Sequence, residues 1–253
     1  MGNEKRRMTK TEKKVILIMS IALVVAIGIF VGVLYVNDYY RATEKADRAM
    51  LGNEVVTIEE SGNYYKLSCN DEARTADAKG IIFYPGGKVE ETAYAPMLLE
   101  LAEQGYEVYL VKMPAKLAVL GMNRAEPIMK EASHIKEWTM MGHSLGGAMA
   151  AAYCASHEED VDQLVLLAAY SLEDISDTDI DVYSFYGSED KVLNMEKYNE
   201  CRSNLPTDLT EQVIDGGNHA FYAHYGPQEG DGEATITREE QQETVLDILL
   251  GEN

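Results

Sequence analysis

Residues 142–147 have the sequence Gly-His-Ser-Leu-Gly-Gly and stand between two segments of different character. The apolar run Trp138–Met141 before them is typical of a buried strand, and the Ala-rich run Leu145–His157 after them is typical of a helix. A serine between a strand and a helix lies on a tight turn, where neighbouring glycines relieve the crowding that a Cβ would cause. Such a turn presents Ser144 Oγ near the positive end of the following helix. Taken alone, the motif also fits a glycine-rich turn without chemistry.

A serine nucleophile needs a base, and the chain has five histidines. His219 ends the sequence Asp-Gly-Gly-Asn-His, just after the last expected strand, and we predict that it is the base. His143 lies inside the turn and is expected to support it rather than to take the proton. The other three are expected in a connection, at a helix end and in a tyrosine-rich loop; they are His134, His157 and His224.

The base in turn needs an acid that orients it. Asp190 ends the sequence Phe-Tyr-Gly-Ser-Glu-Asp at the end of the strand before the last one. Its competitors are Glu189, which would point elsewhere in a tight loop, and Asp181, which begins its strand at the wrong edge. We therefore predict Asp190 as the acid, and the three residues then occur in the chain order nucleophile, acid, base.

The chain from residue 55 onward alternates short apolar runs with helical patterns. Strands are expected at Val55–Glu59, Tyr64–Cys69, Ile81–Tyr84, Tyr106–Lys112, Trp138–Met141, Gln163–Ala169, Asp181–Tyr186 and Glu211–Ile214. Helices are expected near 94–105, over 115–133 with breaks near Gly121 and Pro127, over 145–157 and 194–203, and from Thr237 onward. This alternation predicts an α/β fold with a mostly parallel sheet covered on both faces. Only 11 residues, 170–180, separate two of the strands where a lid would be inserted, so no large lid is expected.

An oxyanion would need two backbone N–H donors close to the serine. One donor is expected from Leu145, the residue after the nucleophile. The other is expected from the loop Tyr84-Pro85-Gly86-Gly87-Lys88, where Gly87 is our choice of donor and Gly86 lets the backbone turn inward. A simple Pro-Gly turn without this role is the alternative interpretation of the loop.

Four segments together resemble the α/β-hydrolase family, and within it bacterial proteins similar to dienelactone hydrolase. They are Ile81–Val89, Val111–Pro114, Gly142–Ala148 and Gly217–Ala220. The resemblance covers about residues 55–250. It implies an eight-stranded sheet, a Ser144–His219–Asp190 triad, and Gly87 and Leu145 as oxyanion donors. Dienelactone hydrolases proper use a cysteine nucleophile, so the serine here favours a serine esterase over a lactone hydrolase.

The histidine loop has a long tail, residues 222–232, in which Tyr222 and Tyr225 are expected to form walls of the substrate pocket. A solvated loop is the alternative. No cofactor and no metal are expected, because the Asp231-Gly232 pair lacks the further carboxylates of a calcium loop. Cys69 and Cys201 could pair in an oxidising compartment, but an odd count of three cysteines without a spacing pattern favours free thiols.

The first 36 residues combine a basic tail with a long apolar run. Residues 1–14 hold six Lys and Arg against two Glu, and they carry +4 while the rest of the chain carries −25. Val15–Val36 is a run of 22 residues without a charge, long enough as a helix to cross a bilayer. A cleaved signal peptide would have a shorter apolar region and a small-residue cleavage site, and a buried core helix would not be apolar on every face. We predict an uncleaved anchor with the tail in the cytoplasm and residues 37–253 outside.

The sequence thus predicts a cytoplasmic tail (1–14), a transmembrane anchor (15–36), a stalk (37–54) and an α/β-hydrolase domain (55–253). The strongly acidic exported part excludes nucleic-acid binding. The leading function is a serine hydrolase of a small-molecule or cell-envelope ester. The alternatives are acyl transfer with the same triad, and an exported binding protein on a hydrolase scaffold.

Overall fold

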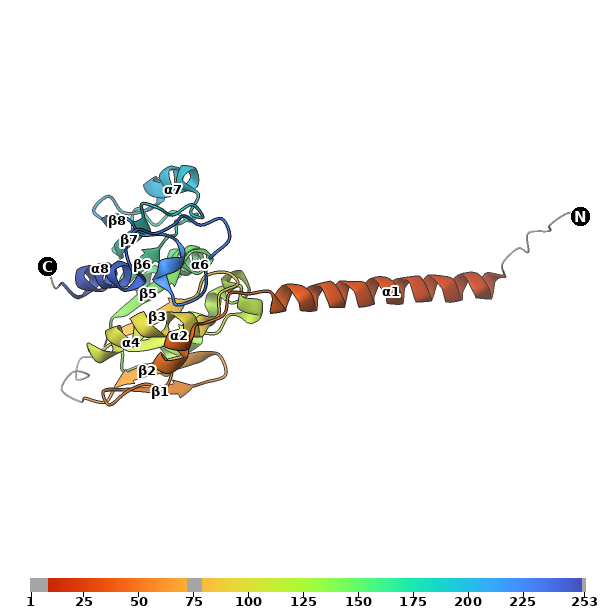
Figure 1. Ribbon diagram of the computed structural model, residues 1–253, viewed down its shortest axis with the longest axis horizontal. Helices are drawn as coiled ribbons and strands as arrows, with labels where there is room; N and C mark the ends of the chain where they lie inside the picture. Colours follow the sequence, from red (N-terminus) through yellow and green to blue (C-terminus); the bar gives the residue numbers. More distant parts are fainter. Residues whose placement is uncertain (1–8, 72–78, 252–253) are drawn as a thin grey trace, which may run out of the picture. The chain divides into compact units, whose positions relative to one another are not determined.

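The structure, a computed structural model, describes residues 9–71 and 79–251 (Figure 1). The chain forms two compact units, Met1–Asp38 and Tyr39–Asn253. The described part of the first unit is a helix, α1 (Lys10–Asn37), which begins at a capping box between Thr9 and Glu12. Its 28 residues are long and apolar enough to cross a membrane, and none of them is buried.

The second unit is built on one eight-stranded sheet (Figure 1). Its strands are β1 (Val56–Glu60), β2 (Tyr64–Cys69), β3 (Gly80–Tyr84), β4 (Glu107–Val111), β5 (Trp138–His143), β6 (Gln163–Leu167), β7 (Asp181–Gly187) and β8 (Thr210–Ile214). The strand order is β1-β2-β4-β3-β5-β6-β7-β8. The β1–β2 and β2–β4 pairs are antiparallel, and all the other pairs are parallel. All eight predicted strands and the α/β class are confirmed.

Helices cover both faces of this sheet (Figure 1). They are α2 (Glu44–Ala49), α4 (Ala95–Glu103), α5 (Ala125–Glu131), α6 (Leu145–Ser156), α7 (Met195–Cys201) and α8 (Arg238–Leu250). Alternate residues of a strand point to opposite faces, so Ile81 and Phe83 pack with α4 and α8, while Ile82 and Tyr84 pack with α5 and α6. The central strand β3 is therefore buried on both sides, as its continuous apolar sequence predicts.

The prediction of a helix over 115–133 is wrong for its first ten residues, 115–124. Three 3-10 turns precede α5: η2 (Pro114–Lys116), η3 (Ala118–Leu120) and η4 (Met122–Arg124). Ala115 and Lys116 have φ of 50° and 54°, and this left-handed backbone cannot continue a right-handed helix. Pro127 does not break α5, because it lies in the first helical turn, where the backbone N–H has no partner within the helix.

The segment after α1 packs onto the second unit from Tyr39 onward, within the region whose composition predicts a stalk. We call residues 39–43 the strap. The Tyr40 N–H donates to the Lys88 carbonyl at 2.8 Å, and the Thr43 N–H donates to the His224 carbonyl at 2.9 Å. The strap therefore joins the loop after β3 to the loop after β8.

Candidate active site

Ser144 occupies the sharp turn between β5 and α6. Its φ of 52° and ψ of −123° place it in a strained left-handed region, which costs on the order of 1–3 kcal/mol. Its N–H donates to the Leu167 carbonyl at 2.9 Å, which holds the turn against the neighbouring strand β6. A Cβ at Gly146 would lie 2.1 Å from the Tyr84 carbonyl oxygen, so only glycine lets α6 begin this close to β3. The turn is the one that the sequence predicts, and Ser144 is half-exposed on it.

His219 and Asp190 form a buried hydrogen-bonded pair. His219 Nδ1 lies 2.8 Å from Asp190 Oδ2. The second carboxylate oxygen of Asp190 accepts the N–H groups of Val192 and Leu193, each at 2.8 Å, so the side chain is held at both ends. With Nδ1 donating to the carboxylate, the imidazole presents Nε2 as a proton acceptor.

The two competitors for the acid lie elsewhere. Glu189 is half-buried beside Asp190, and its backbone N–H donates to the Gly217 carbonyl. Asp181 is exposed at the start of β7, at the opposite end of that strand from Asp190. Of the three carboxylates that the sequence offered, Asp190 is the one bonded to His219.

Ser144 and His219 line one pocket of about 290 Å³. The other lining residues are Leu145, Ala148, Met149, Ala168, Ala169, Tyr170, Leu172, Val192, Leu193 and Asn194. None of these is an acidic or basic residue. His219 Nε2 is buried and has no hydrogen-bond partner among residues 9–71 and 79–251, Ser144 Oγ included. The pocket thus combines a half-exposed hydroxyl, a free imidazole nitrogen and an uncharged wall.

The two predicted oxyanion donors are neighbours. A Cβ at Gly87 would lie 3.1 Å from Leu145 Cδ2 and 3.5 Å from Leu145 Cβ, so the two residues are in contact. Leu145 is the first residue of α6, whose N–H has no partner within the helix. No hydrogen bond in the described part of the chain uses the N–H of either residue. Gly87 and Leu145 are therefore neighbours, and the backbone N–H of each is without a hydrogen-bond partner in the described part of the chain.

Asp231 organises the histidine loop, and the sequence analysis missed this role. Its Oδ1 accepts the N–H of His219 at 3.2 Å, and its Oδ2 accepts the N–H of Ala220 at 2.9 Å. An acceptor for successive N–H groups is what a turn at a short helix needs, and η7 (Ala220–Tyr222) begins there. The only signal in the sequence was an Asp-Gly pair 12 residues after the histidine, too common to indicate a specific contact.

Tyr222 and Tyr225 do not form walls of the pocket that holds Ser144. Their exposed fractions are 0% and 1%, and both belong to the core on the α4 side of the sheet. The chain turns inward through η7, and the Tyr225 ring packs against the Tyr40 ring of the strap, with the two ring centroids 5.4 Å apart. The apolar surface of these rings is buried against the core, which is the more favourable place for it.

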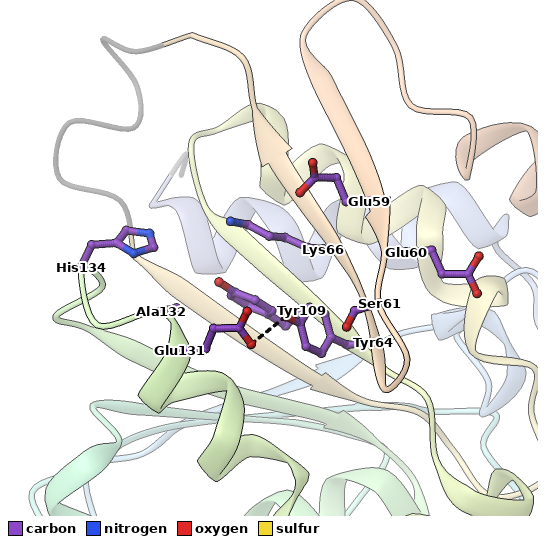
Figure 2. A pocket seen from close by; sticks show the side chains of 9 residues that line it. All are labelled: Glu59, Glu60, Ser61, Tyr64, Lys66, Tyr109, Glu131, Ala132 and His134. Atoms are coloured by element: carbon purple, nitrogen blue, oxygen red, sulfur yellow. Dashed lines mark hydrogen bonds between the residues drawn. The ribbon is translucent and has the colours of Figure 1, made fainter.

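A second hollow, of about 550 Å³, lies over β1, β2 and β4 and contains none of the predicted catalytic residues (Figure 2). Four of its ionisable side chains, those of Glu60, Lys66, Glu131 and His134, are paired with neighbours. Lys66 Nζ lies 3.1 Å from Glu107 Oε1, and His134 Nε2 lies 3.3 Å from Glu107 Oε2. The Tyr64 hydroxyl donates to Glu131 Oε2 at 3.2 Å (Figure 2). The pocket of Ser144 and His219 is therefore the candidate active site.

Over residues 9–71 and 79–251, no group of three or more His, Cys, Asp or Glu residues is arranged to hold a metal ion. Cys69, Cys154 and Cys201 are free and buried.

Solved structures share this fold at low sequence identity. A predicted CIB-like hydrolase from Thermoplasma acidophilum has a TM-score of 0.59 and 15% identity, covering 77% of this chain and 98% of its own. Carboxylesterase CesB from Bacillus subtilis has a TM-score of 0.57 and 11% identity, covering 81% and 96%. Thermogutta terrifontis esterase 2, phosphorylated by paraoxon, has a TM-score of 0.54 and 10% identity, covering 78% and 94%.

No curated protein matches the sequence. A family model does match, over residues 80–243, a range that begins at β3 and ends within α8. It includes the serine turn, the loop of Gly87 and the Asp190–His219 pair. The sheet order, the serine turn and this match agree, and the chain belongs to the alpha/beta hydrolase family.

Proposed function

We propose that this alpha/beta hydrolase is a serine hydrolase of carboxylic esters, with Ser144, His219 and Asp190 as its catalytic triad. The observation that carries the proposal is the state of the imidazole: Nδ1 is bonded to Asp190, and Nε2 is unpaired beside Ser144 in one pocket. A buried nitrogen without a partner is rare, because it costs the free energy of its lost hydrogen bonds. A role in taking up a proton accounts for it.

In the proposed reaction, Ser144 Oγ bonds to the acyl carbon while its proton passes to His219 Nε2. The carbonyl oxygen becomes an oxyanion, which accepts hydrogen bonds from the backbone N–H groups of Gly87 and Leu145. The C–O bond to the alcohol then breaks, and the alcohol leaves with the proton from His219. A water molecule then attacks the acyl-serine while His219 takes its proton, and the ester bond to Ser144 breaks to release the carboxylic acid. Asp190 stabilises the imidazolium in both halves.

The pocket favours a small, uncharged acyl group. Its volume of about 290 Å³ lies at the lower end of the range for ligand pockets. Aliphatic side chains such as Met149, Val192 and Leu193 line it, and burying a charged group against them would cost its hydration. The serine in place of a cysteine also favours simple esters over the lactones of dienelactone hydrolases.

The experiment is ester hydrolysis together with covalent labelling. We expect the protein to hydrolyse p-nitrophenyl butyrate faster than the palmitate ester or an ester of a dicarboxylic acid. A fluorophosphonate should label Ser144, and both Ser144→Ala and His219→Ala should remove most of the labelling. Folded wild-type protein that is neither labelled nor active would contradict the proposal and favour a binding protein.

We further propose that α1 anchors the protein in a membrane, with residues 37–253 on the outer side. The basic tail before the apolar run supports this orientation. A periplasmic or extracellular reporter fused after Asn253 should be active, and the mature protein should keep its first 36 residues. A new N-terminus near residue 37 would show instead that the segment is a cleaved signal.

A further inference from the structure

Three loops of the proposed active site meet at one buried pair of side chains, Tyr94 and His143. The N–H of Gly86 donates to the Tyr94 hydroxyl oxygen at 2.9 Å. That hydroxyl lies 2.8 Å from His143 Nδ1, and His143 Nε2 lies 3.0 Å from the His219 carbonyl oxygen. The chain of hydrogen bonds thus runs from the loop after β3 through the serine turn to the loop of the base.

Three residues of this chain of hydrogen bonds either take part in the proposed reaction or directly precede a residue that does. Gly86 precedes the oxyanion donor Gly87, His143 precedes Ser144, and the last acceptor is the carbonyl of His219 itself. Tyr94 is fully buried, and His143 has an exposed fraction of 1%. Water therefore cannot replace any of these bonds without an opening of the core.

The hydrogen bonds permit a single arrangement of protons. The His219 carbonyl oxygen can only accept, so His143 Nε2 carries the proton and donates it to that oxygen. In the neutral ring Nδ1 is then an acceptor, and it accepts the O–H of Tyr94, whose oxygen also accepts the N–H of Gly86. The other tautomer would set a lone pair of Nε2 against that carbonyl oxygen and leave the Tyr94 O–H unpaired, at the cost of two buried polar groups.

The same arrangement keeps His143 neutral. A second proton, on Nδ1, would face the Tyr94 oxygen and leave the phenol O–H without an acceptor. Burial and the nearby His219 also hold the pKa of His143 well below its ordinary value. The centroids of the His143 and His219 rings are only 4.6 Å apart. Because His143 is neutral, it does not repel the charge that His219 gains when His219 takes up the serine proton.

We propose that Tyr94 and His143 are positioning residues, which hold the loop of Gly87, the turn of Ser144 and the loop of His219 at a fixed spacing through one tautomer of His143. The proposal rests on the proposed function, because that spacing matters only if the three groups act together. The packing around the pair agrees with it. A Cβ at Gly86 would lie 2.8 Å from His143 Nδ1 and 2.9 Å from the Tyr94 oxygen, so the loop approaches the pair as closely as a glycine allows.

The test begins with Tyr94→Phe, which deletes one oxygen and keeps the ring that packs 4.6 Å from Phe83. We expect kcat for p-nitrophenyl butyrate to fall about tenfold, with KM within about twofold, because a displaced oxyanion donor weakens binding of the transition state. The matched control is Tyr198→Phe, on α7. Tyr198 has an exposed fraction of 3%, and its hydroxyl donates to Glu211 Oε1 at 2.6 Å and lies 2.8 Å from Ser184 Oγ, two groups that the proposed reaction does not use. The control should lose stability and keep kcat within about twofold.

A double-mutant cycle tests whether Tyr94 and His143 affect kcat through one shared chain of hydrogen bonds or independently of each other. His143→Asn keeps an acceptor for the Tyr94 O–H and removes the bond to His219, so it too should lower kcat about tenfold. Either change breaks the same chain of hydrogen bonds. The loss of kcat in the double variant Tyr94→Phe/His143→Asn should therefore be well below the roughly 100-fold loss that independent effects would give. Full additivity, or a Tyr94→Phe enzyme as active as wild type, would overturn the proposal.

A measurement that does not depend on activity tests the proton arrangement. In protein with ¹⁵N-labelled histidine, the ring signals of His143, assigned by their loss in His143→Asn, should report the neutral Nε2–H tautomer from pH 5 to pH 8. The Tyr94→Phe variant should show exchange between tautomers. A wild-type ring that is protonated or in the Nδ1–H form contradicts the inference even if the enzyme is active. An inactive wild-type protein with the Nε2–H form contradicts the proposed function and the positioning role, but leaves the hydrogen-bond chain established.

Discussion

Asp190 and His219 are 29 residues apart in the chain and are joined by a 2.8 Å hydrogen bond between two side chains that are almost fully buried. The two backbone amides on the other oxygen of Asp190 keep this carboxylate from turning away from the imidazole. The orientation of His219 is thus set by the loop after β7, before any substrate binds. This rigidity makes the pair sensitive to small chemical changes.

We first predict that Asp190→Asn lowers kcat for a short ester by about 10³–10⁴-fold, because an amide cannot hold the imidazole in the required tautomer. Glu189→Gln is the matched control from the adjacent position and should change kcat by less than about twofold. Steady-state kinetics with circular dichroism as a check on folding measure both. The reverse order of effects would move the acid to Glu189.

A second prediction concerns Asp231. In Asp231→Asn, an amide nitrogen would replace one of the two carboxylate oxygens that accept hydrogen bonds from the N–H groups of His219 and Ala220, and the histidine loop should loosen. We expect kcat to fall about tenfold with little change in KM, and the free energy of unfolding to fall by about 1–3 kcal/mol. Glu233→Gln, at an exposed position of the same loop, should affect neither. Urea titration and kinetics on both variants decide the matter.

Gly146 gives a third prediction, on the serine turn. In Gly146→Ala, the new methyl group would overlap the Tyr84 carbonyl, and α6 would have to move away from β3. We expect a loss of about 3 kcal/mol in the free energy of unfolding and loss of fluorophosphonate labelling. Gly226→Ala is the control, since a Cβ there meets nothing within 4 Å. A stable, fully labelled Gly146→Ala protein would show that the turn is more plastic than its geometry indicates.

The fourth prediction is a pH dependence of stability. Burial, followed by the charges of Arg238 and Lys45, lowers the pKa of His224 to about 4. In the unfolded chain this histidine has a pKa near 6.5, so between pH 6.5 and 4 the unfolded state binds more protons than the folded state. Its contribution to stability is therefore complete above about pH 6.5 and is lost as the pH falls toward 4. The unfolding free energy should drop less over this range in His224→Gln, and an unchanged slope would argue against the shift.

The sequence predicted most of the fold because this fold depends on local patterns. Each strand is a short apolar run, and the alternation with helices leaves few sheet arrangements open. Ser144 could be placed because the strand, the glycines and the helix around it are all visible in one stretch of ten residues. The pairing of His219 with Asp190 followed from the place of each residue just after a predicted strand, and it agrees with the observed contact.

The remaining features depend on contacts between distant segments, which no local pattern contains. Asp231 acts through backbone N–H groups, and any carboxylate at a loop could do so. Tyr222 is buried because η7 turns inward, and the sequence of a tyrosine-rich loop does not give that direction. The left-handed backbone at Ala115 and Lys116 is set by the tertiary structure against their own preference for a helix.

The strap has a consequence for any release of the enzyme by proteolysis. Because Tyr40 and Thr43 bond to the loop after β3 and the loop after β8, the place of a cut decides what is released. A protease that cleaves before Tyr39 would free the whole compact unit with both loops still tied. A protease that cleaves between the strap and β1 would free a catalytic domain whose loops have lost their common tie. If the proposed function holds, we expect the first product to keep its hydrolase activity and the second to lose part of it.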